Sequence, residues 1–311
     1  MKAAAAVLAL SLILPCAHGA GKPRRGAQPK SYAILKDLLR LGHRHAGAPK
    51  RARTLERLAG LLRERGLQVE SQSFESPDPR TGKSWPMTNI VGRFRPESSC
   101  RFLMGSHFDA RHEAEMDPDP ERKTKPITGA NDSGSGVAVL LSLAERFSDV
   151  VPEGVGVDVV LFDGEEMGYP DAGGYCAGSR FFAEKLAPAA QGAKPRFGIV
   201  LDMVASPKTV FKVESYSHQA HPGLVEALWE LGSGRDPSAF SRERWGWIRD
   251  DHVPLTAAGV PSVLVIGFND PRWHTSKDVL AGLSPERLAL VEGMLEDFMR
   301  SRLQPFLGGC P

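Results

Sequence analysis

The sequence predicts an α/β fold of three layers, in which a mixed, largely parallel β-sheet is flanked by helices. Two observations carry this prediction. Apolar runs of strand length alternate with segments of helical periodicity through most of the chain, which is the pattern of a sheet covered on both faces. The composition, 41% hydrophobic and 24% charged over 311 residues, is that of one large domain with a buried core.

The first twenty residues differ from the rest of the chain. Lys2 is followed by the apolar residues 3–14 and then by small residues, which is the pattern of a signal peptide. A membrane-spanning helix needs roughly 20 apolar residues, and this run has only about a dozen. We therefore expect residues 1–20 to direct export to the periplasm or the medium, with no transmembrane segment in the mature chain. Pro15 directly before Cys16 disfavours a lipoprotein anchor there.

The mature chain is expected to form a single domain. We expect a polar linker over residues 21–30, the catalytic domain over residues 31–303 and a short tail over residues 304–311. Strands are expected at 89–94, 102–106, 157–162, 197–203, 210–213 and 262–266. Helices are expected near 34–41, 55–62, 136–147, 179–187, 222–232 and 284–302.

Charge and cysteine content exclude some classes of partner and site. The formal net charge is only +2, so nothing in the composition points to nucleic acid, and we expect a small-molecule or peptide partner. Without the leader three cysteines remain, Cys100, Cys176 and Cys310, so at most one internal disulfide is possible. They form no close cluster, which argues against a thiolate metal site.

Polar side chains follow the predicted strands, where ligands bind in sheets of this kind. His107 and the Glu165-Glu166 pair come directly after two strands, and Asp202 lies within a third. Asp132 opens a predicted helix, and His274 lies in the loop that follows the strand at 262–266.

These residues suit zinc, which takes three His or carboxylate ligands when a fourth position is kept open for catalysis. Asp132, Glu166 and His274 satisfy that count. His107 and Asp202 would complete a second site that shares Asp132, as in two-metal hydrolases. Manganese and cobalt accept the same ligands, so the sequence leaves the metal open.

Each residue also has an ordinary structural explanation. Asp132 could cap a helix, His274 could sit on an exposed loop, and His107 could be a hydrogen-bonded core histidine. The Glu165-Glu166 pair is harder to explain in this way, because like charges at a buried strand end raise each other's pKa and cost stability. We interpret Glu166 as a metal ligand and Glu165 as a general acid/base.

The chain resembles the zinc aminopeptidase superfamily, which also contains the animal-type glutaminyl cyclases. The resemblance covers residues 31–303 and implies a zinc-exopeptidase-like fold. It rests on five blocks in a fixed order, at residues 105–109, 129–133, 165–166, 202 and 273–275. Asp163 before the glutamate pair and the Asp250-Asp251-His252 segment are similar to the cyclases, and the stretches at 117–120 and 175–179 to their bacterial branch.

The cyclase resemblance implies a function, namely conversion of an N-terminal glutamine of peptides or proteins to pyroglutamate with release of ammonia. It implies one zinc ion, a proton network of Glu165, Asp250 and Asp202, and Trp273 as a wall of the substrate pocket. Animal cyclases carry a tryptophan shortly after the glutamate pair, where this chain has Tyr169, which we expect to replace it. They also often carry a disulfide near the site.

Two alternative functions remain at the level of sequence. A two-zinc aminopeptidase would use the same residues with a second ion at His107 and Asp202. A binding domain that has lost catalysis would keep the fold, although relatives of that kind usually lack several ligands. The cysteine pairing is also open. Cys100 and Cys176 could form a disulfide, but they are placed differently from the cysteines of animal cyclases. The sequence does not indicate the oligomeric state.

Overall fold

The computed structural model describes residues 28–186 and 194–309. The predicted signal peptide and most of the predicted linker lie outside these ranges. Within them, no helix combines the length and the apolar composition needed to cross a bilayer.

The central sheet has six strands in the order β1-β2-β4-β3-β5-β8. Strands β4, β3, β5 and β8 are parallel to one another, whereas β1 and β2 form an antiparallel hairpin that joins β4 at one edge. The predicted mixed, largely parallel sheet is therefore confirmed. The strands are β1 (Gln68–Pro77), β2 (Ser84–Phe94), β3 (Cys100–His107), β4 (Val155–Phe162), β5 (Gly198–Asp202) and β8 (Ser262–Ile266).

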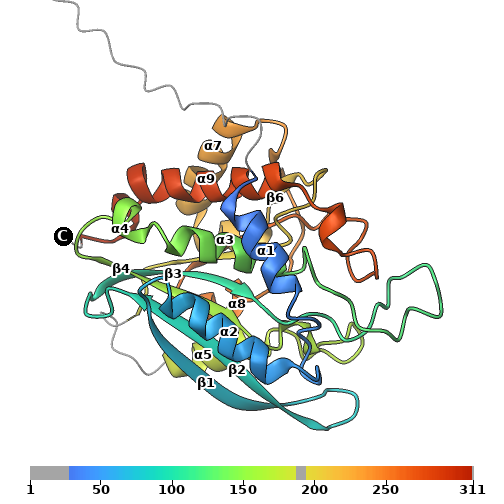
Figure 1. The fold of residues 1–311 in the computed structure, drawn as a ribbon. Coiled ribbons are helices and arrows are strands. Elements are labelled where there is room, and N and C mark those ends of the chain that lie inside the picture. The colour runs from blue at the N-terminus through green and yellow to red at the C-terminus, as the bar shows by residue number, and fades with distance from the viewer. Residues whose placement is uncertain (1–27, 187–193, 310–311) are drawn as a thin grey trace, which may run out of the picture.

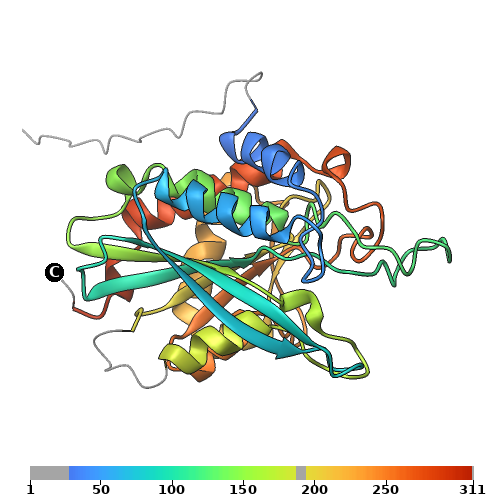
Figure 2. The same ribbon diagram turned by 60° about the horizontal axis from the view of Figure 1, so that its bottom comes forward.

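Helices cover both faces of this sheet. Helices α1, α2, α3 and α9 lie over one face with α7 packed on α9, and α5 and α8 lie over the other (Figures 1 and 2). The long helices are α1 (Lys30–Leu39), α2 (Arg51–Arg63), α3 (Gly134–Ala144), α5 (Ala177–Leu186), α7 (Pro222–Arg235) and α9 (Pro285–Ser301). The short ones are α4 (Phe147–Val150), α6 (Ser215–Ala220), α8 (His252–Ala257), η1 (Glu165–Met167), η3 (Leu280–Gly282) and η4 (Gln304–Phe306).

One predicted strand does not belong to the main sheet. The segment at 210–213 forms β6 (Phe211–Val213), which pairs with β7 (Phe240–Arg244) in a separate two-stranded sheet. Phe211 and Phe240 are buried, and their rings lie 5.0 Å apart between this small sheet and α7. The strand was predicted correctly, but its place in the central sheet was not.

The alternation of side chains along each strand builds two apolar layers, because successive residues of a strand face opposite sides. In β3, Phe102 and Met104 join the large cluster under α3 and α9, whereas Leu103 joins the smaller cluster under α5 and α8. Helix α3 is buried along its whole length. Gly136 permits its close approach, since a Cβ there would lie 2.6 Å from the carbonyl oxygen of Leu201 on β5.

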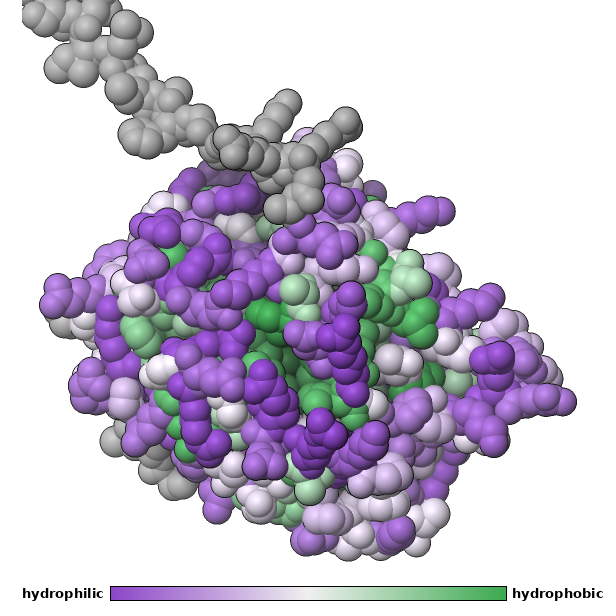
Figure 3. Space-filling view, viewed as in Figure 1, coloured by the Kyte–Doolittle hydropathy of each residue, from purple (hydrophilic) through white to green (hydrophobic). Residues whose placement is uncertain are grey.

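The face carrying α1 and α2 is largely hydrophilic. Figure 3 shows hydrophobic side chains in a hollow among the charged ones on this face. The hollow is a groove of about 570 Å³ whose apolar residues are Ile34, Leu38, Leu41 and Leu61. It lies between two helices, away from the strand ends that carry the predicted ligands.

Candidate metal centre

The predicted ligands lie together at the carboxyl ends of the parallel strands. Three sets of donor atoms lie within 4.8 Å of one another among the described residues. The first is Asp132, Glu166 and His274, which is the predicted zinc set. The second is His107, Asp132 and Asp202, and it shares Asp132 with the first. The third is His107, Glu165 and Glu166.

The first set fits a zinc ion. His274 Nε2 lies 3.4 Å from Glu166 Oε2 and 3.7 Å from Asp132 Oδ2. Two ligand atoms at zinc distances on a tetrahedron are about 3.3–3.6 Å apart, so these spacings suit one ion. All three side chains are buried, and Glu166 Oε2 has no hydrogen-bond partner in the described part of the chain. A buried carboxylate oxygen without a donor is expected where a cation binds.

The loop after β3 supports two of these ligands. Glu115 Oε1 lies 2.5 Å from His274 Nδ1, which leaves Nε2 to face the other ligands. A carboxylate on the far nitrogen of a histidine is the usual support of a metal-binding imidazole. Arg111 Nη1 donates to the backbone oxygen of Glu166 at 3.0 Å and lies 3.5 Å from its side chain.

Buried carboxylates fix the backbone that carries the ligands. Asp109 accepts the N–H groups of Glu165 and Glu166 at 3.2 and 3.1 Å. Asp278 accepts those of Asn131 and Asp132 at 2.7 and 3.2 Å.

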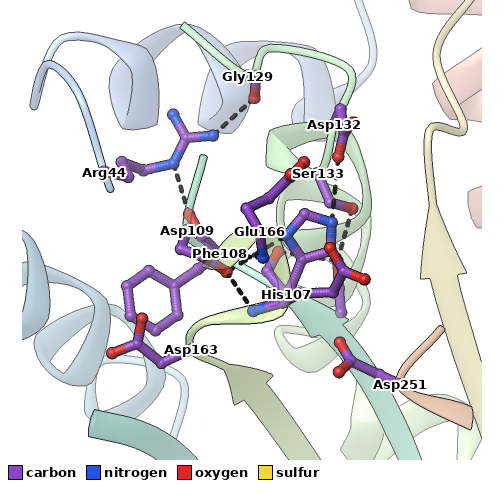
Figure 4. A network of polar contacts seen from close by, with 12 residues as sticks. Arg44, His107, Phe108, Asp109, Gly129, Asp132, Ser133, Asp163, Glu166 and Asp251 are labelled. Atoms are coloured by element: carbon purple, nitrogen blue, oxygen red, sulfur yellow. Dashed lines mark hydrogen bonds and ion pairs between the residues drawn. The ribbon is translucent and has the colours of Figure 1, made fainter. Parts of the chain in front are cut away.

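A buried arginine joins the two loops that flank the ligands. Arg44 donates to the carbonyl oxygens of Phe108 and Gly129, each at 2.6 Å, and thereby ties the end of β3 to the loop before Asp132 (Figure 4). Burial lowers the pKa of Arg44 to about 10, so the side chain is a cation at neutral pH.

The second set is built differently. His107 Nε2 lies 3.2 Å from Asp132 Oδ1 and 3.3 Å from Asp202 Oδ1. The other ring nitrogen, Nδ1, is 3.5 Å from Asp109 and makes no hydrogen bond to a described residue. His107 therefore lacks the close supporting carboxylate that His274 has.

Glu165 lies next to the metal set and faces a different group of side chains. Burial raises the pKa of Glu165 well above its ordinary value, the charge on His107 opposes this rise, and the charge on Glu166 adds to it. The thiol of Cys176 donates to Glu165 Oε1 at 3.4 Å. Burial, together with the nearby charge of Asp202, raises the pKa of Asp250 to about 7. The pKa of Asp250 therefore suits proton transfer near neutral pH, and the pKa of Glu165 is shifted in the same direction.

A cavity of about 500 Å³ opens onto these groups. Trp273 lines it, and its ring stacks on the His274 ring at 3.9 Å. Tyr169 also lines it, but its hydroxyl lies 2.9 Å from His112 Nε2 and donates to Asp78 at 3.3 Å. The hydroxyl of Tyr169 is thus engaged away from the cavity, and the Arg80 guanidinium lies 3.8 Å from the centroid of its ring.

The ordinary structural explanations do not fit Asp132 and His274. Helix α3 begins after Ser133, so Asp132 lies before the cap position. His274 is 3% exposed and is not a surface histidine. His107 is buried, as a core histidine would be, but it lies among three carboxylates.

The disulfide considered between Cys100 and Cys176 is not formed. Cys176 is a buried free thiol. Cys100 is disulfide-bonded.

Sequence reasoning missed the residues that support the ligands, namely Arg111, Glu115 and Asp278, and the rim residues Tyr216 and Trp247. The i, i+4 spacing of Arg111 and Glu115 was a weak signal of their contact at 2.9 Å.

Comparison with known proteins agrees with this geometry. A family model described as peptidase family M28 matches residues 89–299, which is more than half of the chain. The glutaminyl-peptide cyclotransferase of Bos taurus is 28% identical over 274 residues, covering 76% of this chain and 72% of that protein.

Two solved structures are similar over nearly their whole length. The glutaminyl cyclase of Tannerella forsythia is 32% identical, with a TM-score of 0.80 and coverage of 88% of this chain and 98% of that one. A Zn-dependent exopeptidase from Parabacteroides distasonis is 29% identical, with a TM-score of 0.80, and the match covers 89% of this chain and 100% of that one. The ordered sequence blocks, the fold and the family match agree, and the chain belongs to peptidase family M28.

Proposed function

We propose that the chain is a zinc-dependent glutaminyl-peptide cyclotransferase, which converts the N-terminal glutamine of peptides and proteins to pyroglutamate. The observation that carries this proposal is the cavity in which the set Asp132, Glu166 and His274 meets two carboxyls with raised pKa values, Glu165 and Asp250. The cyclases among the similar proteins support it.

The reaction joins two groups of one residue. The α-amine of the glutamine attacks its own γ-carbonyl, and ammonia leaves. The attacking amine and the γ-carbonyl belong to the same residue. Holding them in the reactive orientation therefore supplies much of the rate gain. A zinc ion held by Asp132, Glu166 and His274 would supply a Lewis acid for the γ-carbonyl.

The protein residues would move the protons. Glu165 would accept a proton from the amine as the ring closes and deliver one to the departing ammonia. Asp250 would hold the α-nitrogen, and Asp202, whose charge acts on Asp250, would steady that group. Burial raises the pKa of Asp250 to about 7, which supports proton exchange near neutral pH, and it raises the pKa of Glu165 in the same direction.

The cavity walls suit the glutamine side chain. Trp273 would form one wall and Tyr169 another. The stacking of Trp273 on His274 would also hold the imidazole in place. A cavity of about 500 Å³ has room for one such residue and its ring-closed product.

We propose one ion rather than two. His274 has a supporting carboxylate at 2.5 Å, whereas His107 has none closer than 3.5 Å on its outer nitrogen. Support of that kind strengthens metal binding, so the first set is the better zinc site. His107 would instead hydrogen-bond between Asp132 and Asp202.

We also propose that residues 1–20 direct export and that residues 31–303 form the catalytic domain. The leader has the sequence pattern of a signal peptide, with a run of about a dozen apolar residues, and this pattern supports export. Mass spectrometry of the mature N-terminus after expression in a bacterium with a secretory pathway would test the cleavage.

Metal titration tests the assignment of one zinc ion and its role. The protein is dialysed against a chelator, zinc is returned in measured equivalents, and ammonia release from a peptide that begins with glutamine is followed. One equivalent is expected to restore the full rate. A need for two equivalents would show that the one-ion assignment is mistaken, and ammonia release without any zinc would exclude the proposed Lewis acid.

A further inference from the structure

The mouth of the cavity carries an aromatic side chain that the proposed chemistry does not use. Trp247 is 61% exposed, the highest value among the large exposed hydrophobic side chains of the described residues. It lines the same cavity as Glu165 and Asp250. Its ring meets the ring of Tyr216 edge to face, with centroids 4.7 Å apart, and Tyr216 also lines the cavity. Exposed apolar surface beside a site is typical of a ligand contact.

The segment that carries Trp247 is held in place. Glu214 is fully buried, and its Oε1 accepts the N–H of Ile248 at 3.1 Å and that of Tyr216 at 2.8 Å. Ser215 Oγ donates to the carbonyl oxygen of Trp245 at 2.8 Å. One buried carboxylate therefore fixes the backbone of both segments that bear the aromatic pair. Such a surface is preformed, which lowers the cost of binding.

The position of this pair matches the second residue of a substrate. Asp250 would hold the α-nitrogen of the glutamine, and the same α-carbon bears the carbonyl that leads to the next residue. Trp247 lies three residues before Asp250, so their Cα atoms are at most about 11 Å apart. Consecutive Cα atoms of the substrate are about 3.8 Å apart, so the second side chain starts near this wall.

The chemistry of the wall indicates which side chain it takes. Trp247 and Tyr216 offer aromatic rings, and Ile248 and the 36% exposed Phe268 line the same cavity. Aromatic pairs of this kind favour ring or large apolar partners. We propose that Trp247 and Tyr216 form a subsite for an aromatic or large apolar side chain at the second position of the substrate. This inference rests on the proposed cyclase activity.

The test compares three substrates that differ only after the glutamine, namely L-glutaminamide, Gln-Ala-amide and Gln-Phe-amide. Ammonia release gives kcat/KM for each. The wild-type protein is expected to prefer Gln-Phe-amide over Gln-Ala-amide by about two- to tenfold, the range of a single aromatic contact. Trp247→Ala should bring this ratio close to one, and Trp247→Phe should retain most of it.

Trp85→Ala is the matched control. Trp85 lies on β2 outside the cavity, where Lys83 Nζ sits 3.6 Å from its ring centroid, so its loss should leave the substrate ratio as in the wild type. An unchanged ratio in Trp247→Ala, or a ratio near one in the wild-type protein, would overturn the subsite. If wild-type protein fails even with L-glutaminamide, the cyclase activity itself is wrong, and the subsite falls with it.

Discussion

Glu165 and Glu166 are neighbours in the chain but face different partners. Glu166 Oε2 lies 3.4 Å from His274, within the zinc set, whereas Glu165 Oε1 accepts the thiol of Cys176. Asp109 holds the N–H groups of both, so each carboxylate keeps its own direction. The proposed mechanism therefore assigns metal binding to one glutamate and proton transfer to the other.

Replacing Glu165 tests this division. Glu165→Gln should keep zinc bound and lower kcat by at least about 100-fold, because the amide keeps the shape but cannot accept a proton. Zinc content by atomic absorption and ammonia release give the two readings. Asp132→Ala and His274→Ala should instead release the metal. Loss of zinc from Glu165→Gln would show that the two roles have been exchanged.

Glu115 tests the support of the metal ligand. Glu115→Gln should weaken zinc binding by about 10- to 100-fold, because the carboxylate on Nδ1 of His274 orients the ring and raises its basicity. Competition with a chromogenic chelator measures the affinity. Glu113→Gln is the control in the same loop, since the Glu113 carboxylate lies 3.8 Å from Arg80 and not at the metal set. Equal zinc affinity in both variants would contradict the role of Glu115.

At the scale of elements, α6 and the segment before α8 are joined by one carboxylate. Glu214 accepts from Ser217 N and Oγ and from Ile248 N, and it pairs with His252 Nε2 at 3.0 Å. Burial raises the pKa of Glu214, but the contact with His252 and the backbone hydrogen bonds from Ser217 and Tyr216 together outweigh burial and lower the pKa below its ordinary value of 4.5. The ionised form thus stabilises the folded protein.

The sign of this shift sets a pH dependence. Because the folded pKa lies below the unfolded one, the stabilisation is complete above about pH 4.5 and is lost as the pH falls through the folded value. Glu214→Gln should lower the free energy of unfolding by about 3 kcal/mol at pH 7, since the surrounding hydrogen-bond donors lose a charged acceptor. Urea unfolding at several pH values should show the gap to wild type shrinking below pH 4.5. A difference in unfolding free energy between wild type and variant that stays constant down to pH 3 would contradict a stabilising role of the ionised Glu214.

The elements that the sequence predicted are those with strong apolar patterns. The four parallel strands are buried along their whole length, and α3 is buried all round, so apolar runs marked them. Strand β1 was missed because most of its side chains are polar and partly exposed at the sheet edge. Helices α6 and α8 have six residues each, too few for a helical period to appear.

The site divides in the same way. The convergence of His107, Glu166 and Asp202 could be predicted, because the carboxyl ends of parallel strands meet at one edge of the sheet. Glu115, Glu214 and Trp247 lie on loops or at a short helix cap, where tertiary hydrogen bonds rather than periodicity set the position. No local sequence pattern predicts contacts of this kind.

In the whole molecule, the sheet gathers several carboxylates around one cavity, where a bound cation would offset their charge. Asp132, Glu165, Glu166, Asp202 and Asp250 all line one cavity. Removing zinc should lower the thermal midpoint, because a ligand that binds only the folded state stabilises it in proportion to the logarithm of its concentration over Kd. Differential scanning calorimetry with and without chelator measures this. Asp132→Ala, which lacks a ligand, should show no chelator effect, and an equal shift in that variant would contradict the assigned site.

We propose that this member of peptidase family M28 cyclises rather than hydrolyses. Purified zinc-loaded protein is incubated with two peptides that differ only in beginning with glutamine or leucine, and mass spectrometry identifies what leaves each. A cyclase is expected to release ammonia from the glutamine peptide, with the chain otherwise intact, and to leave the leucine peptide unchanged. Release of free leucine, with the glutamine peptide losing its first residue by hydrolysis, would contradict this proposal and identify an aminopeptidase.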